Sequence, residues 1–221
     1  AAAGAIAVLG VVGLMATEAR ASMTYSFYNI TNNNAGDAAI GEAQLFVDVS
    51  DAGSGDVLFN FRNIGPEASV ISEIYFDDGS LLGIASLIDA DDGVGGDPNV
   101  DFSQGANPPD LPGGNSIVPQ FNVTAGFLAD ADNPAPQNGV APGQSLGIVF
   151  DLQGAQTFAD VLAELGNGTL RIGLHVIAFD SGGSESFVNN TTVVPIPGAV
   201  WLFGSAILGL LGVGYKRKTA A

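Results

Sequence analysis

The clearest pattern in the chain is an alternation of apolar and polar positions in two neighbouring stretches, residues 43–49 (AQLFVDV) and 56–63 (DVLFNFRN). Every second side chain of a β-strand points to the same face, so each stretch can bury one apolar face. The residues between them, 51–55 (DAGSG), are typical of a turn. The sequence therefore predicts a β-hairpin at this point.

Short apolar stretches separated by turn residues continue along most of the chain. The turn sequence Asp77-Asp78-Gly79 lies between two of them and predicts a second hairpin. Repeated short strands are typical of an antiparallel β-sandwich or jelly roll, so the predicted fold class is all-β. The predicted strands outside the first hairpin are residues 25–30, 70–76, 81–88, 121–127, 146–152 and 170–179.

One stretch has helical periodicity instead. The apolar side chains of residues 158–165 fall on one face of a helix. Thr157 and Asp160 have the spacing of a capping box, and Gly166 suits the left-handed position that ends a helix. We expect one short structural helix that packs on the sheet or closes one end of it.

Two stretches show neither periodicity and are predicted to be long loops, residues 89–115 and 129–143. Loops longer than about 15 residues are usually functional or disordered. The first is rich in closely spaced aspartates, whose oxygens could contribute to the roughly 6–8 ligands that Ca²⁺ takes. A solvated acidic loop is the alternative. The candidate ligands for calcium, the one candidate cofactor, are Asp89, Asp91, Asp92 and Asp97.

An uncharged apolar run lies near the end of the chain, at residues 198–215. As a helix it would be about 27 Å long, close to the roughly 30 Å thickness of a bilayer core. Trp201 and Tyr215 are placed to meet the two headgroup layers. This pattern predicts a C-terminal transmembrane helix, with a buried soluble helix as the alternative. A basic tail follows and is expected to stay cytoplasmic: Lys216, Arg217 and Lys218.

Residues 194–218 (VPIPGAVWLFGSAILGLLGVGYKRK) resemble a PEP-CTERM sorting signal, which joins a Pro-x-Pro element, one membrane span and a basic tail. The element here is Pro195, Ile196 and Pro197, with isoleucine in place of the family's glutamate. The resemblance implies a Gram-negative bacterium that makes extracellular polysaccharide, and an exosortase-type transpeptidase as a partner. Residues 189–194 would then be a polar spacer before the signal.

The first residues of the chain are also apolar. Residues 1–21 end in Ala19-Arg20-Ala21, which matches the pattern that signal peptidase requires, with cleavage before Ser22. We interpret them as a signal peptide truncated at its start, and a second transmembrane helix is the alternative. The predicted ectodomain, residues 22–188, would lie outside the cytoplasmic membrane, in the cell envelope, at the surface or in the matrix.

Charge narrows the range of partners. Residues 22–194 contain 22 acidic residues, two arginines and no lysine, a net charge of −20, whereas the whole chain carries −17. Nucleic-acid binding depends on neutralising phosphates with Lys and Arg, so we exclude nucleic acid as a partner. The chain has no cysteine, which excludes disulfides and thiol catalysis.

No sequence motif for catalysis is present, and we predict that the protein is not an enzyme. The single histidine, His175, falls on the less apolar face of its predicted strand and should be partly exposed. Residues 75–78 (YFDD) are a compact group of aromatic and acidic residues, which could bind a sugar or simply end a strand. We expect a structural, adhesive or polysaccharide-binding matrix protein, and the alternative is a secreted hydrolase acting on that polysaccharide.

Processing at both ends can be tested by mass spectrometry of the protein from its native cells. We expect an N-terminus at Ser22 and a C-terminus near Pro197, bare or carrying an added group. A C-terminus at Ala221 would contradict processing and indicate a permanent anchor.

Overall fold

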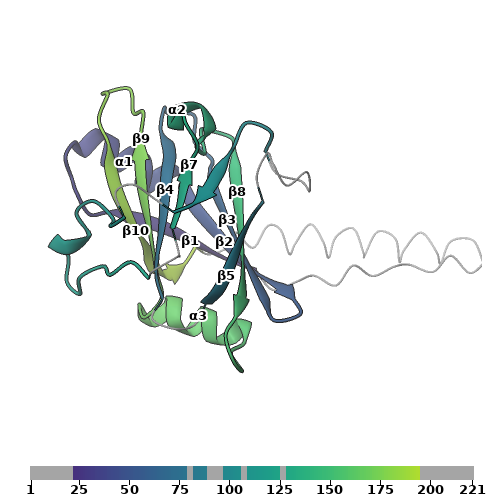
Figure 1. Ribbon diagram of the computed structural model, residues 1–221. Coiled ribbons are helices and arrows are strands. Elements are labelled where there is room, and N and C mark those ends of the chain that lie inside the picture. The colour runs from purple at the N-terminus through teal and green to yellow at the C-terminus, as the bar shows by residue number, and fades with distance from the viewer. Residues whose placement is uncertain (1–21, 79–81, 89–96, 106–108, 125–127, 195–221) are drawn as a thin grey trace, which may run out of the picture.

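A computed structural model describes residues 22–78, 82–88, 97–105, 109–124 and 128–194. The described part is mostly antiparallel β-sheet with few helices, which confirms the all-β prediction (Figure 1). The strands are β1 Ser22–Asn29, β2 Leu45–Gly53, β3 Asp56–Asn63, β4 Val70–Asp77, β5 Leu82–Ile88, β6 Phe102–Gln104, β7 Leu128–Ala131, β8 Ser145–Leu152, β9 Arg171–Ile177 and β10 Glu185–Val193. The helices are α1 Ala35–Gln44, the 3₁₀ turn η1 Gly114–Ser116, α2 Ala135–Asn138 and α3 Phe158–Asn167.

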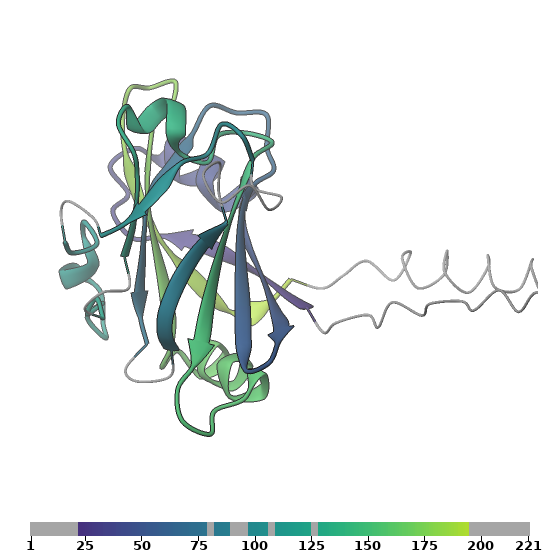
Figure 2. The same cartoon turned by 45° about the vertical axis from the view of Figure 1, so that its right-hand side comes forward.

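The described strands form one continuous sheet in the order β5-β8-β3-β2-β1-β10-β9-β4-β7-β6, rather than two separate sheets. The sheet folds over until it is nearly closed, with the apolar core between its two halves (Figure 2). Strand β1 joins the halves, because its first residues pair with β2 and its last residues pair with β10. A change of register at Tyr25/Phe27 marks the point where β1 turns from one partner to the other.

Aromatic rings from both halves meet in the core. The ring of Phe76 on β4 lies 5.3 Å from that of Phe59 on β3 and 4.8 Å from that of Phe150 on β8, centroid to centroid. The planes are steeply inclined, which is the edge-to-face arrangement that aromatic pairs prefer. These contacts hold together strands that are far apart in the order of the sheet.

The first predicted hairpin is confirmed and the second is wrong. Strands β2 and β3 pair along their length, with Val49 opposite Phe59. Strand β4 instead pairs with β9 and β7, and β5 pairs with β8 at the other edge of the sheet. The reason is burial: from Val70 to Phe76 every side chain of β4 is buried, on both faces. Such a strand needs a neighbour on each side and cover on both faces.

The helix after residue 157 is also confirmed. Thr157 and Asp160 form the predicted capping box, and α3 buries Val161 and Leu165 against one end of the core (Figure 1). The helix continues past Gly166, and Gly168 takes the left-handed conformation at its end, with φ of 79°. Helix α1 was not predicted, because its only strong local signal is the cap in which Asn34 accepts from the backbone of Gly36 and Asp37.

The stretches expected to be two loops and a spacer contain regular structure. The first predicted loop, residues 89–115, contains β6 and the start of η1. Residues 129–143 include part of β7 and all of α2, and residues 189–193 belong to β10. In β10 Val193 lies opposite Tyr25, and the next amide, that of Val194, donates to the carbonyl of Thr24 at 2.7 Å. The folded unit therefore reaches Val194, and its two ends lie side by side.

The predicted signal peptide, the Pro-x-Pro element and the apolar run at 198–215 lie outside the described residues. Within the described ranges, no helix has the length and apolar character needed to cross a membrane. The membrane anchor thus stays a prediction from the sequence.

A buried carboxylate fixes the connection from β1 to α1. Glu185 of β10 accepts hydrogen bonds from the amides of Asn33 and Asn34, the hydroxyl of Thr31 and the side-chain amide of Asn29, at 2.5–3.1 Å. Burial acts to raise the pKa of Glu185, but these donors outweigh it and hold the pKa below its ordinary value. The ionised carboxylate therefore stabilises the fold.

This predicts a specific loss of stability in acid. At neutral pH Glu185→Gln should lower the free energy of unfolding by about 1–3 kcal/mol, because its NH₂ group would face donors. A lowered carboxylate pKa contributes stability above the unfolded-state pKa, and that contribution disappears as the pH falls through the folded-state pKa. Urea unfolding at pH 7 and pH 3 should therefore show the difference between wild type and variant shrinking in acid.

Glu164→Gln is the matched control. Burial, followed by Asp78 and Asp160, raises the pKa of Glu164, so removing its charge should not destabilise the protein at neutral pH. Equal losses in the two variants at pH 7 would contradict the role given to Glu185.

Candidate functional site

The outer face of β4, β9 and β10 is covered by residues 109–124, which we call the covering segment (Figures 1 and 2). Its Leu111 and Phe121 pack on Tyr75 of β4 and Val188 of β10, and all four side chains are buried. They form a small apolar cluster distinct from the main core. The covering segment thus supplies the second apolar layer that the two-sided burial of β4 requires.

A glycine allows the covering segment to approach the sheet closely. A Cβ atom at Gly173 of β9 would lie 2.7 Å from Leu111 Cδ2 and 3.1 Å from Phe121 Cζ. Real Cβ atoms essentially never come within 3.0 Å of another heavy atom, so a larger residue would force the Leu111 side chain to shift and would crowd the Phe121 ring. The absence of a side chain at Gly173 therefore lets Leu111 and Phe121 pack directly on the backbone of β9.

Arg171 of β9 holds residues 119–122 of the covering segment against the sheet. Its guanidinium donates to the carbonyls of Pro119 at 2.8 Å and Gln120 at 2.5 Å, and it pairs with the carboxylate of Asp77. The ring of Phe121 lies under it, 5.2 Å from Cζ to the ring centroid. The same Asp77 carboxylate accepts from the amide of Asn122 at 3.0 Å.

This arrangement explains why the predicted strand at 121–127 is wrong over its described residues, 121–124. These residues make separate contacts instead of a strand ladder. The amide of Phe121 donates to the carbonyl of Gly114 at 3.0 Å, and that of Thr124 donates to the carbonyl of Phe76 at 2.7 Å. Residues 125–127 lie outside the described part.

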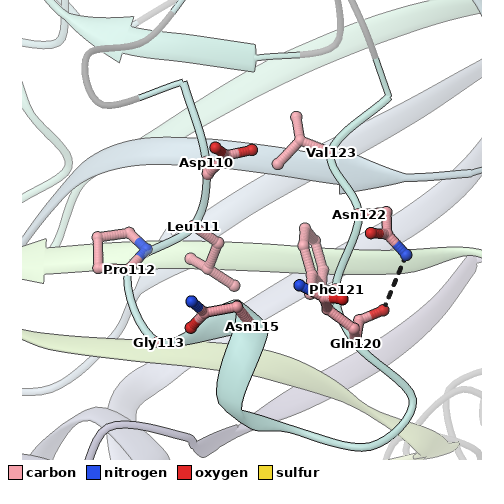
Figure 3. A pocket seen from close by; sticks show the side chains of 9 residues that line it. All are labelled: Asp110, Leu111, Pro112, Gly113, Asn115, Gln120, Phe121, Asn122 and Val123. Carbon is pink, nitrogen blue, oxygen red and sulfur yellow. Dashed lines mark hydrogen bonds between the residues drawn. The ribbon is translucent and has the colours of Figure 1, made fainter.

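A pocket of roughly 530 Å³ opens between the two arms of the covering segment, residues 110–115 and residues 120–123 (Figure 3). This volume falls within the range of about 300–1,000 Å³ that is common for small-molecule sites. Leu111 and Phe121 lie at the centre of the view, and polar side chains surround them. The lining residues are Asp110, Leu111, Pro112, Gly113, Asn115, Gln120, Phe121, Asn122 and Val123.

The pocket is polar at its rim and apolar at its base, where Leu111 and Phe121 lie. Asp110, Asn115, Gln120 and Asn122 are exposed, so their carboxylate and amide groups can bind a ligand. Burial raises the pKa of the Tyr75 phenol under the segment, and the charges of Glu73, Asp130 and Asp110 raise it further. Three carboxylates therefore act on the same part of the molecule.

Within the described part of the chain, neither residues 75–78 nor His175 forms a sugar-stacking or serine–histidine site. Tyr75 and Phe76 are fully buried, so neither ring can stack on a sugar. His175 is partly exposed, as predicted, and its Nδ1 bonds the carboxylate of Glu73. Ser186 lies opposite His175 on β10, but its hydroxyl is buried and has no hydrogen-bond partner. A serine nucleophile would need a bond to its base, and the structure does not provide one here.

Most of the other predicted site residues lie outside the described part. These include Asp89, Asp91 and Asp92, the signal-peptide residues Ala19 and Ala21, and all predicted sorting and anchor residues. Ser22 begins β1 and pairs with Ser50.

Asp97, one of the predicted calcium ligands, accepts a hydrogen bond from the amide of Asn99 at 3.1 Å, which closes a local turn. Among the described residues, no group of three or more acidic or histidine side chains could hold a metal ion. The calcium site stays a prediction.

No family model, curated protein or solved structure matches this chain. The functional argument therefore depends on the geometry of the pocket. Sequence reasoning missed the pocket because residues 109–115 were predicted to be part of a loop and residues 121–124 part of a strand, although Leu111 and Phe121 in a Pro- and Gly-rich stretch are a usable signal.

Replacing Arg171 should loosen the contact of residues 119–122 with the sheet. In Arg171→Lys one ammonium group cannot reach both carbonyls and Asp77, so we expect a loss of about 1–3 kcal/mol in the free energy of unfolding. Hydrogen exchange at the amides of Phe121 and Asn122 should also accelerate.

Arg62→Lys is the control for this experiment. Arg62 pairs with Asp48 at 2.5 Å, but both side chains are more exposed than those of the Arg171 pair. We expect less than about 1 kcal/mol from this change. If both variants lose equal stability and the exchange of Asn122 is unchanged, Arg171 does not hold the segment.

Proposed function

We propose that the protein is an exported cell-surface or matrix protein that binds polysaccharide through the pocket in the covering segment. The observation that carries this proposal is the lining: three side-chain amides and one carboxylate around an apolar base. Sugars present hydroxyl groups at their edges and C–H groups on their faces, so they match amide donors and acceptors beside apolar side chains.

The pocket is positioned for a large ligand. It is open to solvent on the outer side of the sheet, and Arg171, Asp77 and Gly173 fix the backbone on which its lining residues lie. Fixed polar groups reduce the entropy lost on binding. A polymer could therefore enter the pocket with one unit and continue over the surface on either side.

Export and anchoring rest on the terminal sequences. The apolar run at 198–215, the basic tail and the Pro-x-Pro element support a transmembrane helix that an exosortase-type transpeptidase processes. The ends of the folded unit, at Ser22 and Val194, lie side by side, so both terminal segments would leave from one place. This arrangement supports an ectodomain held at one end, with the pocket free to face the matrix.

The double substitution Asn115→Ala/Gln120→Ala tests the pocket. Both side chains are exposed, and a hydrogen bond contributes about 0.5–1.5 kcal/mol, so binding of the preferred polysaccharide should weaken about tenfold. Full-length protein in a neutral detergent can be tested against a panel of neutral, cationic and anionic oligosaccharides by calorimetry.

Asn99→Ala provides the matched control, because Asn99 is an exposed amide that does not line the pocket. It should leave affinity unchanged. Failure to bind any member of the panel, or equal losses in the control and the double variant, would overturn the proposed function.

A further inference from the structure

We infer that the pocket prefers a cationic amino-sugar glycan, whose protonated amine faces Asp110. This inference rests on the proposed function and narrows its ligand to one chemical class. It follows from the charges of the protein, the position of Asp110 and the nature of the other rim groups.

The first step concerns the cations that an acidic glycan would need. Residues 22–194 contain Arg62 and Arg171 and no lysine. Arg62 makes two bonds to Asp48, at 2.5 and 3.0 Å, and Arg171 pairs with Asp77. Both guanidinium groups are therefore neutralised by a carboxylate within the protein. Uronate, sulfate or phosphate groups would meet a net charge of −20 without a free Lys or Arg side chain to bind them.

The second step concerns Asp110. Its side chain is exposed at the rim of the pocket, and it forms no ion pair or hydrogen bond with another described residue. An ammonium group that reaches it forms a charge-assisted hydrogen bond, which is roughly twice as strong as a neutral one.

The third step concerns the remaining rim groups. Asn115, Gln120 and Asn122 carry no charge and offer both donors and acceptors. They suit the ring hydroxyls of a hexose. Since Asp110 is the one charged residue of the lining, the position of the amine is specified by a single carboxylate.

Two probes with the same backbone separate these contributions: the β-1,4-linked hexamer of glucosamine and the corresponding hexamer of N-acetylglucosamine. They differ only in whether the nitrogen is a free amine or an uncharged acetamide. With full-length protein in neutral detergent at pH 6 and about 0.15 M salt, we expect the amine form to bind at least tenfold more tightly. The preference should disappear as the pH rises above the pKa of the amine.

Asp110→Asn should weaken binding of the amine hexamer about tenfold and leave the acetylated hexamer within twofold. Asp180→Asn is the control, because it removes the same charge from an exposed turn that does not line the pocket. Asp110→Glu should retain the preference, and unchanged thermal unfolding will show that each variant is folded.

Each other outcome has a distinct meaning. Equal affinity for the two hexamers would overturn the amino-sugar inference and leave polysaccharide binding standing. Equal losses in Asp110→Asn and Asp180→Asn would show general attraction of a polycation to an acidic protein, and would also overturn it. Absence of binding to both hexamers, with binding to a neutral or anionic glycan from the wider panel, would overturn the inference alone.

Discussion

The contact between Phe76 and the aromatic rings of the opposite half holds the fold together. Phe76 lies on β4, and its ring meets Phe59 and Phe150 edge to face. Burying a phenylalanine side chain contributes roughly 1.5–3 kcal/mol, and each aromatic pair adds about 0.5–1.5 kcal/mol. Without cysteine to cross-link the halves, this packing is what keeps a long sheet folded over on itself.

The burial of Phe76 on the inner face of β4 has a consequence on the outer face. Tyr75 alternates with it and must point the other way, where it is also fully buried. The covering segment provides that burial, and Gly173 and Arg171 on the adjacent strand fix its position. The pocket is therefore a product of the same strand that completes the core.

Local signals predicted the parts of the fold that depend on neighbouring residues. The alternation around the 51–55 turn lies within residues 43–63, and the capping box lies within residues 157–160, and the structure confirms both. The second hairpin failed because the choice of partner for β4 depends on β9, about a hundred residues later. The alternation of apolar and polar residues predicts that a strand exists, but it does not indicate which strand pairs with it.

Strand β10 shows why polar composition misled the prediction of a spacer. Asn189 is buried, and its side-chain oxygen accepts from the amide of Ile172 at 2.7 Å. An asparagine that hydrogen-bonds a neighbouring backbone can occupy a strand interior, although its type usually marks a turn. The pocket was also not predicted. Asp77 was predicted only to follow a strand, and its ion pair with Arg171, which holds one arm of the covering segment, forms only in the folded chain.

If the pocket binds a glycan as proposed, charge and shape together would explain how so acidic a surface recognises its ligand selectively. A uniform field attracts any cation and is screened within about 8–10 Å by physiological salt. Selectivity requires a charge at a defined position, beside groups that test the rest of the ligand. Asp110 lies at such a position, next to the amides of the two arms that Arg171 and Gly173 hold on the sheet. On the proposed function, the field would raise the local concentration of cationic ligands, and the pocket would bind those whose amine and hydroxyl groups fit it.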